Sequence, residues 1–114
     1  MSAKARSAAA KRGAYAPVFA ALGDETRLAL ISKLSAGRPY SIAQLTDGTQ
    51  LTRQAVTKHL RVLENAKLVR SVRNGRESQF QLDPAPLRAV RDYADMVSMQ
   101  WDETLARLKA FVEK

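Results

Sequence analysis

The sequence of 114 residues contains no cysteine and a single histidine, and no apolar stretch in it is long enough to span a membrane. The absence of cysteine excludes disulfide bonds, thiolate metal sites and thiol redox chemistry, and it is compatible with a reducing cytoplasm. The sequence also has no glycine-rich phosphate loop and no pair of acids in a segment expected to form a pocket. We therefore predict neither catalytic residues nor a cofactor, and we expect a cytoplasmic protein that is not an enzyme.

Acidic residues are scarce where basic residues are dense. The formal net charge is +8, with seven basic and two acidic residues in 51–82, and four basic and no acidic residues in 1–14. This distribution predicts a polyanionic partner. We expect residues 1–14 to be a disordered basic arm, although a mitochondrial transit peptide shares this composition, and residues 15–114 to form one domain.

An amphipathic helix is predicted over residues 51–63, a stretch without acidic residues. Val56, Leu60 and Leu63 recur at helical spacing and form its apolar stripe. The remaining arc carries the polar side chains of Arg53, Gln54, Thr57, Lys58 and Arg61. Thr52 can cap the helix start, so that Arg53 and Gln54, which can make bidentate contacts to guanine and adenine, project from the first turn. This arc is typical of a DNA recognition helix, and a solvated surface helix is the alternative interpretation.

Shorter helices are predicted before this one. Residues 17–22 indicate a helix closed by Gly23, which is suited to the left-handed conformation, and Asp24 caps a second helix. Residues 41–44 have the capping-box pattern that opens a third helix. Only residues 49–51 separate this third helix from Thr52. Two short helices joined by so brief a turn predict a helix-turn-helix.

A basic hairpin is predicted next. Residues 68–73 and 76–82 have the pattern of two strands, and Asn74-Gly75 between them is the strongest short signal for a two-residue turn. Arg73 and Arg76 flank the tip, where they can approach phosphates or a narrow minor groove. A hairpin directly after a recognition helix is typical of the wing of a winged helix-turn-helix. Taken alone, it would be a structural hairpin with surface arginines.

A long helix is predicted to end the chain, opened by Pro84 and Pro86. Its apolar residues recur by threes and fours over about 26 residues, or roughly 40 Å, which one small domain cannot cover. Folding back on its own core is one interpretation, and pairing with the same helix of a second copy is the one we favour. The predicted homodimer interface comprises Leu87, Val90, Val97, Trp101, Leu105 and Leu108, with Val18 and Phe19 of the first helix.

The chain closely resembles the ArsR/SmtB family of bacterial repressors over residues 15–113. The specific motifs are Ala21-Leu22-Gly23-Asp24-Glu25-Thr26-Arg27, Gln54-Ala55-Val56-Thr57-Lys58-His59-Leu60, Leu63-Glu64-Asn65-Ala66-Lys67-Leu68-Val69 and Asn74-Gly75-Arg76. The resemblance implies a mainly α fold with a β-hairpin wing, a homodimer held by its first and last helices, and repression through double-stranded DNA with an inverted-repeat operator. It also implies that His59 lies near DNA. An architectural or protein-contacting winged helix without sequence readout is the alternative function.

Two departures from the family pattern bear on structure and mechanism. Lys67 stands where members commonly have glycine, at a helix end where a left-handed conformation is expected, which implies a strain of roughly 1–2 kcal/mol. The founding members sense metals through cysteines before the recognition helix or through His and carboxylate ligands on the last helix. Here residues 44–47 contain no cysteine, and the last helix contains no histidine. Its acids are Asp92, Asp95, Asp102 and Glu103. We therefore expect no metal site and a metal-independent branch of the family.

Overall fold

The structure, a computed structural model, describes residues 2–113. Its elements in chain order are α1 (Ala3–Leu22), α2 (Glu25–Leu34), β1 (Tyr40–Ser41), α3 (Ile42–Thr46), α4 (Arg53–Asn65), β2 (Val69–Asn74), β3 (Glu77–Leu82) and α5 (Ala85–Val112). The predicted fold class, mainly α with a β-hairpin, is confirmed. The structure also contains the short strand β1, which the sequence analysis missed.

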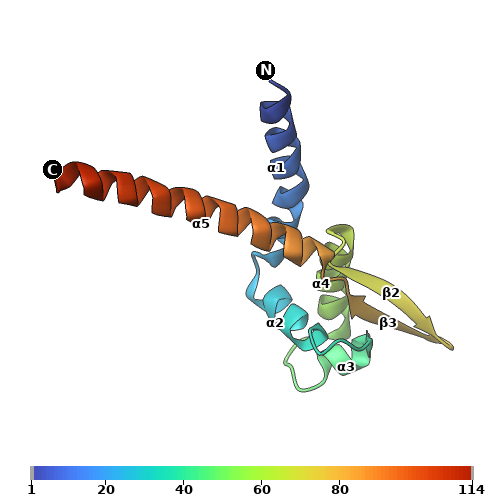
Figure 1. The fold of residues 1–114 in the computed structure, drawn as a ribbon. Helices are drawn as coiled ribbons and strands as arrows, with labels where there is room; N and C mark the ends of the chain where they lie inside the picture. Colours follow the sequence, from blue (N-terminus) through green and yellow to red (C-terminus); the bar gives the residue numbers. More distant parts are fainter. Residues whose placement is uncertain (1, 114) are drawn as a thin grey trace.

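The chain consists of a small body and two long helices that diverge from it (Figure 1). Helices α2, α3 and α4 form the body together with the hairpin of β2 and β3, while the start of α1 and most of α5 project outward, so that the two termini lie far apart. The radius of gyration is 19.0 Å and the principal extents are 67 × 33 × 21 Å. A compact domain of this length would have a radius of gyration of about 13 Å. Much of α1 and α5 is therefore left without a covering layer from the same chain.

The sheet has the strand order β1-β3-β2, and both pairings are antiparallel. Tyr40 pairs with Phe80, and both side chains are buried. At the other end of the hairpin, Asn74 pairs with Glu77, so the two-residue turn is Gly75-Arg76. The predicted turn, Asn74-Gly75, was therefore wrong by one residue. Gly75 has a φ of 62° and is the first central residue of the turn, a position that favours glycine.

The core lies where α2, α3 and α4 meet the base of the hairpin. Its fully buried side chains are Leu34, Leu45, Val56, Leu60, Leu63 and Leu68. The apolar stripe predicted for the recognition helix supplies three of them, Val56, Leu60 and Leu63. Because these three side chains anchor one face of α4, the opposite polar face is held toward solvent.

The first helix is longer than the sequence pattern indicated. It begins at Ala3, where the Ser2 hydroxyl accepts a hydrogen bond from the N–H of Ala5 at 3.1 Å, and it continues through Pro17. The expectation of a disordered arm over residues 1–14, and of a helix starting at Pro17, therefore differs from the structure. Residues 3–14 are exposed, and six of them are alanine, the residue with the strongest intrinsic helix preference. Local helix propensity explains the extension.

Two helix ends differ in how they use the left-handed conformation. Gly23 ends α1 with a φ of −79°, so the left-handed conformation considered for it is wrong. Lys67, by contrast, has a φ of 65° at the end of α4, as the family pattern implied. Its N–H donates to the Glu64 carbonyl, and the N–H of Leu68 donates to the Leu63 carbonyl, each at 3.0 Å. This pair of bonds is the Schellman motif, formed here around a residue with a side chain.

Candidate nucleic-acid interface

Local capping sets where α3 and α4, the two helices of the predicted helix-turn-helix, begin. At the start of α3, the N–H of Gln44 donates to the Ser41 hydroxyl at 3.0 Å, and the N–H of Ser41 donates to Oε1 of Gln44 at 2.9 Å. This capping box confirms the predicted pattern. Asp47 ends the helix, and the Thr52 hydroxyl accepts from the N–H of Ala55 at 3.0 Å to start α4. The predicted helix-turn-helix is therefore present, with both starts capped as expected.

The first two turns of α4 present a polar surface. Arg53, Gln54 and Lys58 are exposed, and Thr57 is half-buried between them. With Ile42 of α3, these four side chains line an open hollow of about 700 Å³. The Thr57 hydroxyl donates to the Arg53 carbonyl at 2.7 Å. The side chain can therefore present only a hydrogen-bond acceptor and a methyl group to a partner. Side chains that can read base edges therefore meet at one end of the helix.

A second hollow extends this surface over α3. It has a volume of about 500 Å³ and is lined by Ala43, Gln44, Thr46, Asp47, Gly48, Thr49 and Arg53. Arg53 borders both hollows, so the α3 residues belong to the same face as the start of α4. The sequence analysis gave Gln44 only a capping role. Its Oε1 is used in the capping box, and its NH₂ group remains as a donor at this face.

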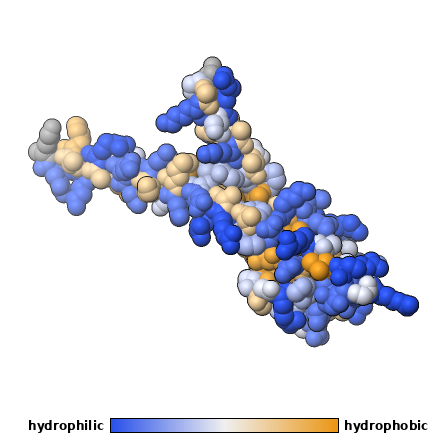
Figure 2. Space-filling view, turned by 45° about the vertical axis from the view of Figure 1, so that its right-hand side comes forward, coloured by the Kyte–Doolittle hydropathy of each residue, from blue (hydrophilic) through white to orange (hydrophobic). Residues whose placement is uncertain are grey.

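The remaining predicted contact residues are divided between α4 and the hairpin. Arg61 is exposed further along α4, while Arg73 and Arg76 are exposed at the hairpin tip. Nε of Arg73 donates to the Gly75 carbonyl at 3.3 Å, which ties this side chain to the turn. Hydrophilic side chains predominate on the body in Figure 2. The exposed arginines of the 51–82 segment are therefore distributed over both α4 and the hairpin.

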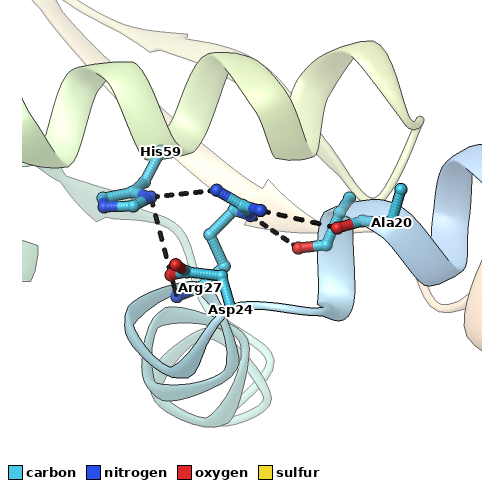
Figure 3. A network of polar contacts seen from close by, with 5 residues as sticks. Ala20, Asp24, Arg27 and His59 are labelled. Atoms are coloured by element: carbon cyan, nitrogen blue, oxygen red, sulfur yellow. Dashed lines mark hydrogen bonds and ion pairs between the residues drawn. The ribbon is translucent and has the colours of Figure 1, made fainter.

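His59 occupies a different place from the other predicted contact residues. Its side chain is 25% exposed and faces the start of α2, where Nδ1 lies 3.3 Å from Nη1 of Arg27 and 3.8 Å from Oδ2 of Asp24 (Figure 3). Asp24 also accepts the N–H of Arg27 at 3.0 Å, and this bond holds the pKa of the Asp24 carboxyl below its ordinary value. His59 therefore joins two helices of the body and lies apart from the exposed residues of α4.

The predicted dimer residues are divided between the core and the surface. Val18 and Val90 are each 7% exposed and belong to the core of the single chain, and Leu87 packs against that core. These three side chains therefore pack inside the single chain. The others remain exposed, from Phe19 at 43% to Trp101 at 61%, with Val97, Leu105 and Leu108 between these values. Apolar residues form a broken row along the projecting α5 in Figure 2.

Other apolar residues of α5 are exposed as well. Phe111 and Val112, which extend the predicted stripe, are exposed by more than 70%, and Met96 and Met99, which sequence reasoning missed, by 48% and 61%. Tyr93 of α5 packs against Tyr15 and Phe19 of α1 with tilted and edge-on rings, whose centroids are 5.5 and 6.0 Å apart. The α1–α5 contact is therefore built from aromatic rings near the body, and beyond it the apolar residues of α5 face solvent.

Within residues 2–113, no three His, Cys, Asp or Glu side chains gather closely enough to hold a metal ion. Nor does any helix in this range combine the length and the hydropathy needed to cross a membrane.

Comparison with known proteins identifies the fold. The model of a helix-turn-helix domain family matches residues 22–72. The HTH-type transcriptional regulator Rv2034 of Mycobacterium tuberculosis is 33% identical over 96 residues, which cover 74% of this chain and 89% of that protein. The uncharacterized HTH-type transcriptional regulator YuzN of Bacillus subtilis is 38% identical over 77 residues, covering 62% of this chain and 84% of that protein.

A solved structure agrees with these sequence matches. An ArsR-like transcriptional regulator from Rhodococcus sp. RHA1 is 35% identical, with a TM-score of 0.75 over 87% of this chain and 92% of that one. These relatives are transcriptional regulators, and the order of helices and hairpin is shared with the solved structure. The chain therefore belongs to the helix-turn-helix transcriptional regulators of the ArsR type.

Proposed function

We propose that this regulator is a cytoplasmic repressor that binds double-stranded DNA as a homodimer and recognises an inverted-repeat operator. The observation that carries the proposal is the exposed set Arg53, Gln54 and Lys58 at the start of α4. Arginine and glutamine are the side chains suited to bidentate contacts with guanine and adenine, and the recognition helix of a helix-turn-helix places its first turns against base edges. Thr52 caps this end of the helix and holds the set in place.

The hairpin and the far end of α4 have a different proposed role. Arg61, Arg73 and Arg76 are exposed and lie away from the start of α4. Arginines at such positions bind phosphates, and phosphate contacts fix the register of a protein on DNA without reading its sequence. A module that only coats DNA would need this second set alone. The presence of both sets favours sequence-specific recognition over an architectural role.

The homodimer is supported by the uncovered surface of α5. In the single chain Trp101 and Leu108 are more than half exposed, and they recur with Val97 and Leu105 along a helix that projects from the body (Figure 1). Large apolar side chains exposed at regular spacing along one helix favour an interaction site. A second copy of the same helix, related by a two-fold axis, offers a matching row. Two copies would place two α4 helices about one helical turn of DNA apart.

The repression that we propose does not depend on a metal ion. No cysteine occurs in the chain, and α5 contains no histidine. Its acids, Asp92, Asp95, Asp102 and Glu103, are exposed and form no cluster of three potential ligands within the described residues. Carboxylates alone bind only hard cations such as Mg²⁺ and Ca²⁺.

The test uses the DNA upstream of the protein's own gene, searched for an inverted repeat. Arg53→Ala and Gln54→Ala are each expected to weaken binding to this operator by about 1–3 kcal/mol, and to weaken binding to a random duplex of equal length much less. Fluorescence anisotropy at fixed salt measures both affinities. Arg88→Ala is the matched control, because Arg88 is exposed at the start of α5 and its loss removes the same charge. Equal losses on operator and random DNA would contradict base reading by α4.

A further inference from the structure

One side chain joins three helices. Arg27 lies in the first turn of α2, and its Nε donates to the Ala21 carbonyl at 2.6 Å. Its Nη2 donates to the Ala20 carbonyl at 3.4 Å, and its Nη1 lies 3.3 Å from Nδ1 of His59 in α4 (Figure 3). The guanidinium is therefore held between the end of α1, the start of α2 and the middle of the recognition helix.

The end of α1 requires such a partner. The last carbonyls of a helix lack N–H donors within the helix and carry its negative partial charge. The last turn of α1 contains no basic residue of its own, and Arg27 supplies the cation from α2. A guanidinium donates in several fixed directions at once, which the ammonium of a lysine does not do. The same rigid group can therefore satisfy α1 and still reach α4.

The link lies beside an open hollow on the surface. This hollow of about 390 Å³ is lined in part by Pro17 and Ala20 of α1 and by Val62 and Asn65 of α4. Arg27 borders the hollow. Its contact with His59 is thus a polar bridge at the edge of the α1–α4 junction.

The bridge depends on the protonation state of His59. An arginine guanidinium only donates, so Nδ1 of His59 must accept, which places the proton of the neutral ring on Nε2. The charged groups that the structure places against His59 are Arg27 of α2 and Asp24, which caps the start of that helix. A proton on Nδ1 would remove the acceptor lone pair and repel the guanidinium of Arg27. It would instead favour a contact with the carboxylate of Asp24, whose Oδ2 lies 3.8 Å from the same nitrogen. Two partners therefore compete for one nitrogen.

We propose that Arg27 and His59 are positioning residues that fix the orientation of the recognition helix. The proposal rests on operator binding by α4. Arg53 lies six residues before His59, roughly 9 Å along the helix axis, so a tilt of about 5° at His59 moves Arg53 by roughly 0.8 Å. A hydrogen bond to a base edge tolerates a change of only about 0.5 Å in donor–acceptor distance. Since α1 belongs to the proposed dimer interface, the contact between Arg27 and His59 also fixes how the two recognition helices of the dimer are oriented relative to each other.

The first part of the test reads the ring of His59 without DNA. His59 is the only histidine, so its two ring nitrogens give the only imidazole signals in a ¹⁵N-correlated NMR spectrum. At about pH 8, where an ordinary imidazole is neutral, the wild type should show the Nε2–H tautomer, and Arg27→Gln should shift the ring toward a mixture of tautomers. An Nδ1–H tautomer in the wild type would overturn the proposal.

The second part measures the ratio of operator affinity to random-duplex affinity at fixed salt. Arg27→Gln and His59→Phe, which remove the donor and the acceptor respectively, should each lower this ratio by about 3- to 10-fold, a loss in the range expected for one hydrogen bond. His59→Asn is the matched control, because its amide oxygen offers an acceptor near the position of Nδ1, and it should keep the ratio within about twofold. His59 is partly exposed, so His59→Phe should leave the fold intact even where Arg27→Gln does not. An unchanged ratio in His59→Phe would overturn the proposal.

Rescue by His59→Asn separates positioning from a merely structural role. If the wild type shows no operator preference, the proposed function fails, and the tautomer measurement still decides whether the bridge exists.

Discussion

Replacing Lys67 with glycine is expected to stabilise the protein. Lys67 has a φ of 65°, a conformation that costs a residue with a Cβ about 1–2 kcal/mol and costs glycine almost nothing. Glycine also has more freedom in the unfolded chain, which offsets about 0.4–1 kcal/mol of that gain. The Lys67 side chain is exposed, so its removal takes little packing from the core. The net expectation is a stabilisation of about 0.5–1 kcal/mol.

Urea unfolding followed by circular dichroism measures this difference. With a slope of about 2 kcal/mol per molar, the midpoint should rise by about 0.3–0.5 M. All variants are compared at one protein concentration, because association with a second copy would make the midpoint depend on concentration.

Two matched variants test the reasoning. Lys58→Gly makes the same chemical change inside α4, where glycine costs about 1 kcal/mol, so its midpoint should fall. Lys67→Gln removes the charge and keeps the Cβ, so its midpoint should not move. If Lys67→Gly lowers the midpoint as Lys58→Gly does, a left-handed residue does not end α4 in solution.

Four further outcomes follow from the site and the helices. Arg73→Gln combined with Arg76→Gln should weaken binding to all DNA sequences and reduce the log–log salt slope by about 0.9 for each lost phosphate contact; an unchanged slope would exclude the hairpin from the phosphates. Trp101→Glu combined with Leu105→Glu should abolish dimerisation in analytical ultracentrifugation, and operator binding with it; a wild-type monomer that binds one half-site tightly would refute the proposed assembly. Zinc, cadmium or arsenite at modest excess should leave operator affinity unchanged in anisotropy, and a loss reversed by a chelator would show a metal site. The lowered pKa of Asp24 means that its carboxylate adds stability above the ordinary carboxyl pKa, and that this contribution is lost as pH falls through the lowered value. Asp24→Asn should therefore make the urea midpoint less dependent on pH below about 4, and an unaltered dependence would contradict the assignment.

The helix-turn-helix was predictable because its signals are local. The capping residues Ser41 and Thr52 lie within three residues of the N–H groups that they accept, and the apolar stripe of α4 follows helical spacing. Such signals do not depend on the rest of the fold. The exposed start of α4 could therefore be located from the sequence, together with the residue types that it presents.

The errors arose where distant contacts decide the structure. The hairpin turn is Gly75-Arg76, with Gly75 at positive φ as its first central residue, and an Asn-Gly pair alone does not specify which turn position the glycine takes. Strand β1 has two residues, too few for an alternating pattern. His59 meets Arg27 across 32 positions of sequence, so the family resemblance, which implied that His59 lies near DNA, could not reveal its partner. The core positions of Val18 and Val90 likewise depend on how α1 and α5 cross.

Proline inside α1 gives this helix an uneven resistance to amide hydrogen exchange. Pro17 has no N–H to donate to the carbonyl of Gly13, so one hydrogen bond is missing between the exposed first turns and the segment that holds the buried Val18 and Ala21. Local opening of the first turns exposes almost no apolar surface and needs little free energy, whereas opening the last turn disturbs the core. Amide hydrogens before Pro17 should therefore exchange through fraying, and those after it only through larger openings of the domain. Any gain in protection before Pro17 would then report directly that another molecule has covered the start of the helix.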